Sequence, residues 1–215
     1  MHPAEFIAYD LGHMAENFLH THTALKLLLP KEIHSVCQST SVKKGTLLFQ
    51  TGKKPQRMFF VVNGEVTLER LSQHGDPVVL QRTRQGFVSE ASLHSPNYHC
   101  DARAVAHSDM IQIPLAVLRN ALEKDLAFAG RWISMLNQEV RRLRLQCERL
   151  NMKSVKDRVL HLIHTEGKNG HYPVHTGLKS LAGELGVTHE ALYRTLASLE
   201  KQALIQRQGG LLCIL

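Results

Sequence analysis

Residues 177–204 read GLKSLAGELGVTHEALYRTLASLEKQAL and predict two short helices joined by a tight turn. The first half carries four apolar residues at the spacing of one buried helical face: Leu178, Leu181, Ala182 and Leu185. Gly186 follows where the first helix should end, because glycine adopts the left-handed conformation without steric cost. Thr188 is then a natural N-cap for a second helix.

The second helix separates an apolar face from a polar one. Its buried face should consist of Leu192, Leu196 and Leu199. Its opposite face carries His189, Glu190, Tyr193 and Arg194. Two helices joined by a short turn that contains glycine are typical of the helix-turn-helix, which reads DNA. The alternative is a helical hairpin in an ordinary core, with Glu190 and Arg194 as a surface ion pair.

The chemistry of the polar face suits base reading in the major groove. Arginine can bind guanine O6 and N7 bidentately, and glutamate can accept a hydrogen bond from cytosine N4. We expect Glu190, Arg194, His189 and Tyr193 to face the bases. We expect Thr188, Lys179 and His175 to contact phosphates, which fixes the register of a complex without reading its sequence.

Composition and charge agree with a DNA partner. The 215 residues are 43% hydrophobic and 21% charged, as in ordinary globular proteins, and are enough for one large or two modest domains. The formal net charge of +7 favours a polyanionic partner. Residues 151–215 hold eight Lys or Arg against five Asp or Glu, so the basic excess per residue is greater there.

Several protein classes lack support in the sequence. The four cysteines lie far apart without a C-x-x-C pair, which argues against a disulfide framework or a zinc ribbon. No apolar run or leader suggests a membrane segment or secretion, so we expect a cytoplasmic protein with no membrane partner. No P-loop, G-x-S-x-G or H-E-x-x-H motif occurs, and the histidines are scattered, so we expect neither an enzyme nor a metal site.

Short strands dominate the first half of the chain. Residues 1–36 are loosely helical, and from Ser41 to Pro114 short β runs alternate with glycine-containing turns. Asn63-Gly64 after the apolar run Met58–Val62 predicts a hairpin, and Glu65–Leu71 alternates polar and apolar residues. Seven or eight such strands predict an antiparallel double-sheet roll.

A long helix should follow the roll. Its apolar residues recur at alternating spacings of four and three: Ala129, Ile133, Leu136, Val140, Leu143, Cys147 and Leu150. So narrow a stripe favours pairing with a second copy of the chain, and we assign the dimer seam to Ile133 through Leu150. The alternative is a helix packed on its own domain.

The last segment predicts a winged helix. A capped helix at Ser154–Ile163, a short strand at Tyr172–Val174, the helix-turn-helix and a hairpin at Gly209-Gly210 follow in order. The fold class is therefore α+β. We expect an effector-sensing β-roll domain with an N-terminal helical segment at 1–125, a dimerisation helix and hinge at 126–152, and a winged-helix DNA-binding domain at 153–215.

This order of parts resembles the CRP/FNR family of bacterial transcription regulators over residues 37–215. The likeness lies in Gly45, Gly52, Phe60–Val66, Gln85–Glu90, Ala102–Ala104 and Gly186–Arg194. It implies a cyclic-nucleotide-binding-like roll, and it implies that Glu190 and Arg194 read the G·C pairs of a TGA-like half-site. His189 and Tyr193 depart from the residues common in the family, which leaves the flanking preferences open.

The same resemblance implies an effector pocket. We expect it at Ser89, Glu90, Ala91, Tyr98, His99 and Cys147. Tyr98-His99 stands where cyclic-nucleotide-binding relatives carry an Arg-Ser pair for the phosphate, which disfavours cAMP. No cysteine precedes Cys37, which disfavours an iron–sulfur cluster. Haem stays open because His2, His94, His99 and Cys100 are residue types that ligate iron. The cofactor is therefore unassigned.

The sequence thus predicts a homodimeric, sequence-specific transcription regulator. It should read a near-palindrome in double-stranded DNA, act with RNA polymerase, and respond to a small-molecule or redox signal in the β roll. The alternative is a haem- or small-molecule-binding sensor that acts mainly through protein contacts.

Overall fold

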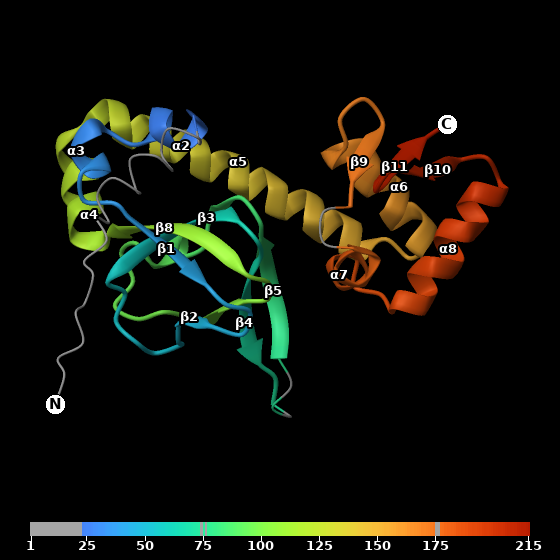
Figure 1. Cartoon of the computed structure of the whole chain (residues 1–215), viewed down its shortest axis with the longest axis horizontal. Coiled ribbons are helices and arrows are strands. Elements are labelled where there is room, and N and C mark those ends of the chain that lie inside the picture. The colour runs from blue at the N-terminus through green and yellow to red at the C-terminus, as the bar shows by residue number, and fades with distance from the viewer. Residues whose placement is uncertain (1–22, 74, 76, 175–176) are drawn as a thin grey trace, which may run out of the picture. The chain divides into compact units, whose positions relative to one another are not determined.

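The computed structural model describes residues 23–73, 75, 77–174 and 177–215 (Figure 1). The chain divides between Ile133 and Ser134 into two compact units. The helices are α2 (Thr23–Leu28), α3 (Lys31–His34), α4 (Leu115–Lys124), α5 (Leu126–Asn151), α6 (Val155–Glu166), α7 (Gly177–Glu184) and α8 (His189–Lys201). The strands are β1 (Gln38–Val42), β2 (Leu47–Phe49), β3 (Arg57–Asn63), β4 (Val66–Leu71), β5 (Pro77–Thr83), β6 (Gly86–Phe87), β7 (Asp101–Ala104), β8 (Ser108–Pro114), β9 (His171–Pro173), β10 (Ile205–Gln208) and β11 (Leu211–Ile214).

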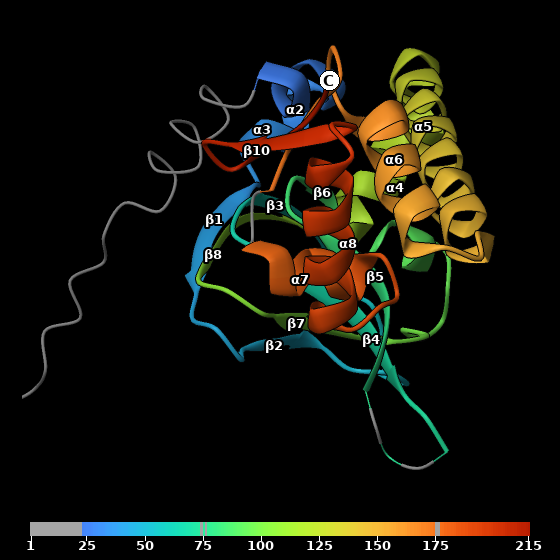
Figure 2. The same ribbon diagram turned by 90° about the vertical axis from the view of Figure 1, so that its right-hand side faces the viewer.

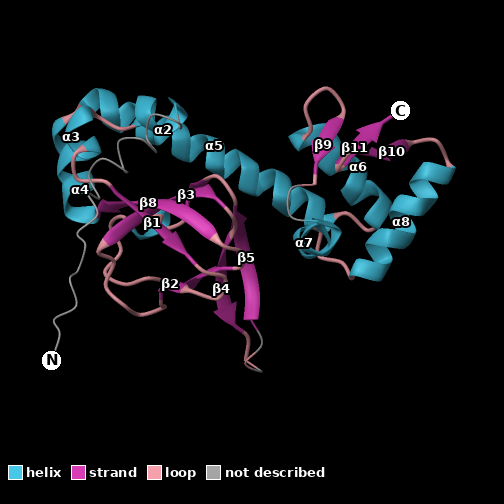
Figure 3. Cartoon of the chain, in the orientation of Figure 1, coloured by secondary structure: helices cyan, strands magenta, loops and turns pink. Residues whose placement is uncertain are grey.

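Two antiparallel sheets make the first unit a double-sheet roll, as predicted (Figure 3). The strand orders are β1-β8-β3-β6 and β2-β7-β4-β5. Apolar side chains fill the space inside the roll: Phe49, Phe59, Val61, Val66, Leu68, Val88, Tyr98, Cys100, Ala102 and Met110. Burial of these side chains supplies the driving force that holds the two sheets together.

The predicted hairpin at Asn63-Gly64 is wrong. β3 pairs with β8 and β6, whereas β4 pairs with β7 and β5, so the turn carries the chain from one sheet to the other. Gly64 has a φ of +89°, and a Cβ there would lie 2.4 Å from the His107 carbonyl oxygen. Glycine is therefore needed for a close approach at a corner, and the Asn-Gly signal does not distinguish that from a hairpin.

β4 and β5 form a hairpin that extends beyond the rest of the roll (Figure 2). The pairing register shifts between Leu68 and Glu69, and such a bulge changes which face the following side chains occupy. Leu71, the last residue of β4, lies beyond this bulge and is 72% exposed.

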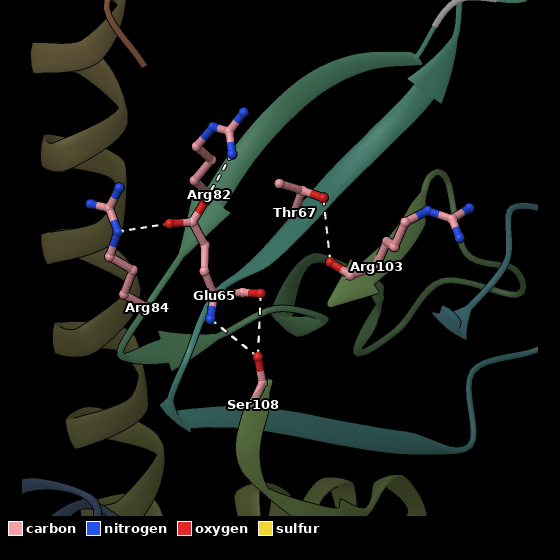
Figure 4. A network of polar contacts seen from close by, with 6 residues as sticks. All are labelled: Glu65, Thr67, Arg82, Arg84, Arg103 and Ser108. Atoms are coloured by element: carbon pink, nitrogen blue, oxygen red, sulfur yellow. Dashed lines mark hydrogen bonds and ion pairs between the residues drawn. The ribbon is translucent and has the colours of Figure 1, made fainter. Parts of the chain in front are cut away.

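A polar network lies at the base of this hairpin (Figure 4). The Glu65 carboxylate accepts hydrogen bonds from Arg82 at 2.8 Å and Arg84 at 2.9 Å, and its side chain is only 3% exposed. The Glu65 N–H donates to Ser108 Oγ at 3.1 Å. The network thus ties β5 and β8 to the corner that Gly64 makes.

The start of α5 belongs to the first unit. Phe128 and Trp132 are buried, and the Trp132 ring lies 4.9 Å from the Phe87 ring of β6. Both residues lie off the apolar stripe that the sequence singles out. Helices α2, α3 and α4 gather at one end of the roll (Figure 1). No helix of the described residues is long and apolar enough to cross a membrane.

The second unit contains α6, α7 and α8 and the three-stranded sheet β10-β11-β9. Its core takes apolar side chains from each helix and from the sheet: Val159, Leu162, Ile163, Tyr172, Leu181, Ala182, Leu185, Leu192, Leu196, Leu199, Ile205 and Leu212. The predicted winged helix-turn-helix is therefore present, and the turn of its β10–β11 hairpin is Gly209-Gly210, where both glycines have positive φ.

Candidate nucleic-acid interface

The turn between α7 and α8 has the predicted left-handed glycine and the predicted threonine N-cap. Gly186 has a φ of +65°, and Thr188 Oγ1 accepts a hydrogen bond from the Ala191 N–H at 3.2 Å. Leu192, Leu196 and Leu199 are at most 1% exposed, so the apolar side of α8 is anchored in the core. The opposite side of α8 is fixed on the surface of the second unit.

That exposed side carries the four predicted base-reading residues. His189, Glu190, Tyr193 and Arg194 are all exposed. Hydrogen bonds from its own N–H and from Thr188 lower the pKa of Glu190, so this carboxylate is ionised at neutral pH. A carboxylate in the first turn is also favoured by the helix dipole. The face therefore presents one anionic acceptor and one cationic donor a helical turn apart.

The two flanks of α8 differ. On one flank, the His189 and Tyr193 rings pack edge to face with centroids 4.5 Å apart and an interplanar angle of 72°. On the other flank, Arg194 borders an open groove of about 400 Å³. The remaining residues of this groove are Val155, Lys156, Ala191, Thr195, Ser198 and Leu199.

An ion pair joins α8 to the wing. Arg207 of β10 donates to Glu200 from Nε at 3.0 Å and from the terminal guanidinium at 2.6 Å, and its backbone N–H donates to the same carboxylate at 3.1 Å. Hydrogen bonding to Arg207 lowers the pKa of Glu200. The pair is partly exposed, so its main effect is to orient the wing relative to the helix.

The predicted phosphate contacts are spread around this face. Lys179 lies exposed on α7, and Thr188 is exposed although its hydroxyl caps α8. His175 lies outside the described residues. The sequence reasoning missed Lys156, which is half-buried in the first turn of α6 and lines the same groove as Arg194. The sequence signal that could have found Lys156 is its place in the first helical turn, two positions after the Ser154 cap.

Two of the predicted effector residues fill the roll instead of lining an open site. Tyr98 is 5% exposed, stacks on Phe49 with centroids 3.9 Å apart, and donates to the Arg57 carbonyl at 3.3 Å. Ser89 is buried and accepts from the Phe59 N–H at 3.2 Å. Both hydroxyl groups therefore bond to backbone groups of β3.

The other predicted effector residues have varied surroundings. Glu90 is half-buried in a 3₁₀ turn with the exposed Ala91, and His99 is exposed. Cys147 is exposed and belongs to the second unit. The structure thus places five of the six residues in the first unit and the sixth in the second.

The candidate haem ligands differ in their exposure. His94 and His99 are exposed, His2 lies outside the described residues, and Cys100 is buried. Burial raises the pKa of the Cys100 thiol, and it raises that of Cys37 to about 12, so both thiols are protonated at neutral pH. Among the described residues, no group of three or more His, Cys, Asp or Glu could hold a metal ion.

The proposed dimer seam is an exposed apolar stripe on α5. Ile133, Val140 and Leu150 are 56%, 45% and 41% exposed, and Leu136 and Leu143 are half-buried. If α5 instead packed this stripe against its own domain, these side chains would be buried. In the single chain the stripe is therefore available to a partner.

Known proteins share this architecture. Residues 39–125 match the family model of the cyclic nucleotide-binding domain. FixK2 from Bradyrhizobium japonicum is 19% identical over 83% of this chain and 92% of its own, with a TM-score of 0.66. TTHB099, a CRP-family transcriptional regulator from Thermus thermophilus, is 16% identical over 82% and 91%, with a TM-score of 0.57. The chain has the CRP/FNR fold.

Two further proteins are similar to this chain. CLP from Xanthomonas campestris, a global regulator that responds to c-di-GMP, is 20% identical over 90% of this chain and 98% of its own, with a TM-score of 0.56. An uncharacterized protein of Haemophilus influenzae is 24% identical over 93 residues, which are 41% of this chain and 72% of the relative. The CRP/FNR fold thus extends over both units, and residues 39–125 form its cyclic-nucleotide-binding-type roll.

Proposed function

We propose that this protein is a sequence-specific DNA-binding transcription regulator. The observation that carries the proposal is the exposed face of α8, where Glu190 and Arg194 project from a helix whose other face is fully buried. In helix-turn-helix proteins the N-terminal residues of such a helix contact base edges in the major groove. Regulators of the same fold, such as TTHB099, support the assignment.

Arg194 and Glu190 would divide the reading of a half-site. Arg194 donates bidentately to a guanine, and the ionised Glu190 accepts from a cytosine amino group, which matches a TGA-like core. Lys156, Lys179 and Thr188 would hold the phosphates on either side, and RNA polymerase would be the protein partner of the bound complex. The net charge of +7 adds attraction that does not depend on sequence.

The protein should act as a homodimer. The exposed α5 stripe supports pairing of two copies, and two copies of α8 would then enter successive major grooves of a near-palindrome. We assign the signal to the β roll. Because Tyr98 and Ser89 bond within the roll, we expect cAMP not to be that signal.

The second candidate is a haem-based or small-molecule sensor whose output is a protein contact. His94 and His99, two exposed histidines near Cys100, are the observation that favours it. An absorption spectrum of the freshly purified protein separates the two, since bound haem gives an intense Soret band.

Replacement of Arg194 tests the proposed role in base reading. The operator is first selected from a random DNA pool with the full-length protein. Arg194→Ala should then lose about 1–3 kcal/mol of discrimination at one guanine of each half-site, measured by titration of matched and substituted duplexes. Lys201→Ala is the control, because Lys201 is exposed on the same helix at its far end. Unchanged preference in Arg194→Ala would remove this residue from base reading.

A further inference from the structure

The His189–Tyr193 ring pair is a surface feature that core packing does not explain. Tyr193 is 44% exposed and His189 is exposed, yet their rings meet edge to face at 4.5 Å. Both lie in the first two turns of α8, where the apolar anchors are Leu192 and Leu196 on the other side. The pair is therefore preassembled on the surface of α8 that the proposed function turns toward DNA.

The pair occupies a different row from Glu190 and Arg194. Each pair has the i,i+4 spacing of neighbours along a helix, and the two rows are one residue, or about 100°, apart. Arg194 borders the groove next to α6. His189 and Tyr193 are not among the residues that line this groove. The two rows would therefore meet different base pairs.

The chemistry of the aromatic row limits what it can read. Two rings in edge-to-face contact hold each other in place and present mainly carbon atoms to the groove. They lack the paired donors with which arginine binds guanine or asparagine binds adenine. The one apolar group in the major groove is the C5-methyl of thymine, which apolar side chains contact in preference to the other bases.

We propose that the His189–Tyr193 pair reads the C5-methyl group of a thymine in a base pair next to the one that Arg194 reads. The proposal rests on the proposed function and adds a specific thymine to each half-site. Tyr193 supplies the contact, and His189 sets the ring orientation.

Uracil substitution tests the contact directly, because deoxyuridine lacks only the methyl group. In the selected operator, each thymine is replaced in turn by deoxyuridine, and the Kd of the full-length protein is measured. One position in each half-site should weaken binding about fourfold, which corresponds to about 0.8 kcal/mol for one buried methyl group. Tyr193→Ala should bind the thymine and uracil duplexes equally at that position, whereas Tyr193→Phe should retain the difference.

Controls separate this inference from the proposed function. His164→Ala, an exposed histidine on α6, should retain the full uracil response. The inference is overturned if no thymine is sensitive in the unmodified protein, or if Tyr193→Ala keeps the same sensitivity. If uracil has no effect while Arg194→Ala still loses discrimination at guanine, the thymine contact alone is wrong. If the random pool gives no preferred sequence, the proposed function fails as well.

Discussion

Glu65 is buried because two arginines reach it from β5 and the segment after it. Burial by itself raises the pKa of a carboxyl group, but here the hydrogen bond from Arg82 and the charge and hydrogen bond of Arg84 outweigh that effect. The pKa of Glu65 therefore lies below its ordinary value of 4.5 in the folded state. The resulting stabilisation is present at pH values above the unfolded pKa and is lost as the pH falls through the folded pKa.

Glu65→Gln should destabilise the roll by about 2–3 kcal/mol at neutral pH, because it removes the buried anion to which Arg82 and Arg84 both donate. The loss should shrink as the pH falls below about 4. Urea unfolding can be followed by the fluorescence of Trp132, the sole tryptophan, which is buried in the same unit. Glu69→Gln is the matched control, since its Arg103 partner is 40% exposed and the pair should contribute less than about 1 kcal/mol. Equal losses in both variants would contradict the role given to burial.

At the scale of elements, a buried arginine of α5 contacts α6. Arg149 is 1% exposed and donates to Glu166, to Thr165 Oγ1 at 3.4 Å and to His161 Nδ1 at 3.4 Å. Arg158 adds a second tie, from its Nε to the Met152 carbonyl at 3.0 Å. The link between the two helices is therefore braced, and the last turns of α5 move with the second unit.

Arg149→Ala should loosen that junction. It removes a buried cation and leaves a cavity, at a cost of about 3 kcal/mol. Hydrogen exchange by mass spectrometry should show faster exchange at 148–152 and 161–166, with α8 unchanged. Arg144→Ala, an exposed arginine on the same helix, should leave the exchange as it was. Unchanged exchange at the junction in Arg149→Ala would show that the helices hold together without this side chain.

The sequence predicts the local structure of this protein better than its long-range contacts. The helix-turn-helix follows from local rules: leucine spacing, a glycine with positive φ and a threonine cap. The burial of Glu65 does not, because it depends on which residues β5 places across from β4, and a bulge alters that register. The burial of Arg149 cannot be predicted either. An arginine in a helix is expected to be exposed unless its partners on another helix are known.

At the scale of the whole molecule, the second unit carries both most of the apolar α5 stripe and the exposed face of α8. A single reading helix makes few base contacts, and two linked copies bind a palindrome far more tightly than either does alone. The stripe and the proposed DNA contacts are thus parts of one requirement, a second copy of the chain. We therefore expect the seam to set the affinity for operator DNA without contacting the DNA.

Val140→Glu should therefore separate the subunits and weaken operator binding together. A buried charge at the centre of the seam is unfavourable, so light scattering should show a monomer at concentrations where the unmodified protein is a dimer. Its affinity for the full operator should fall by at least about 100-fold, to that of a single half-site. Gln138→Glu places the same charge on the outer face of α5, and this variant should remain a dimer.

The spacing of the half-sites gives a second test. Moving them apart by about 5 base pairs, half a helical turn, should weaken DNA binding by the unmodified protein and should not change DNA binding by the Val140→Glu monomer. If the monomer responded to spacing as the dimer does, pairing through α5 would not be what sets the distance between the reading helices.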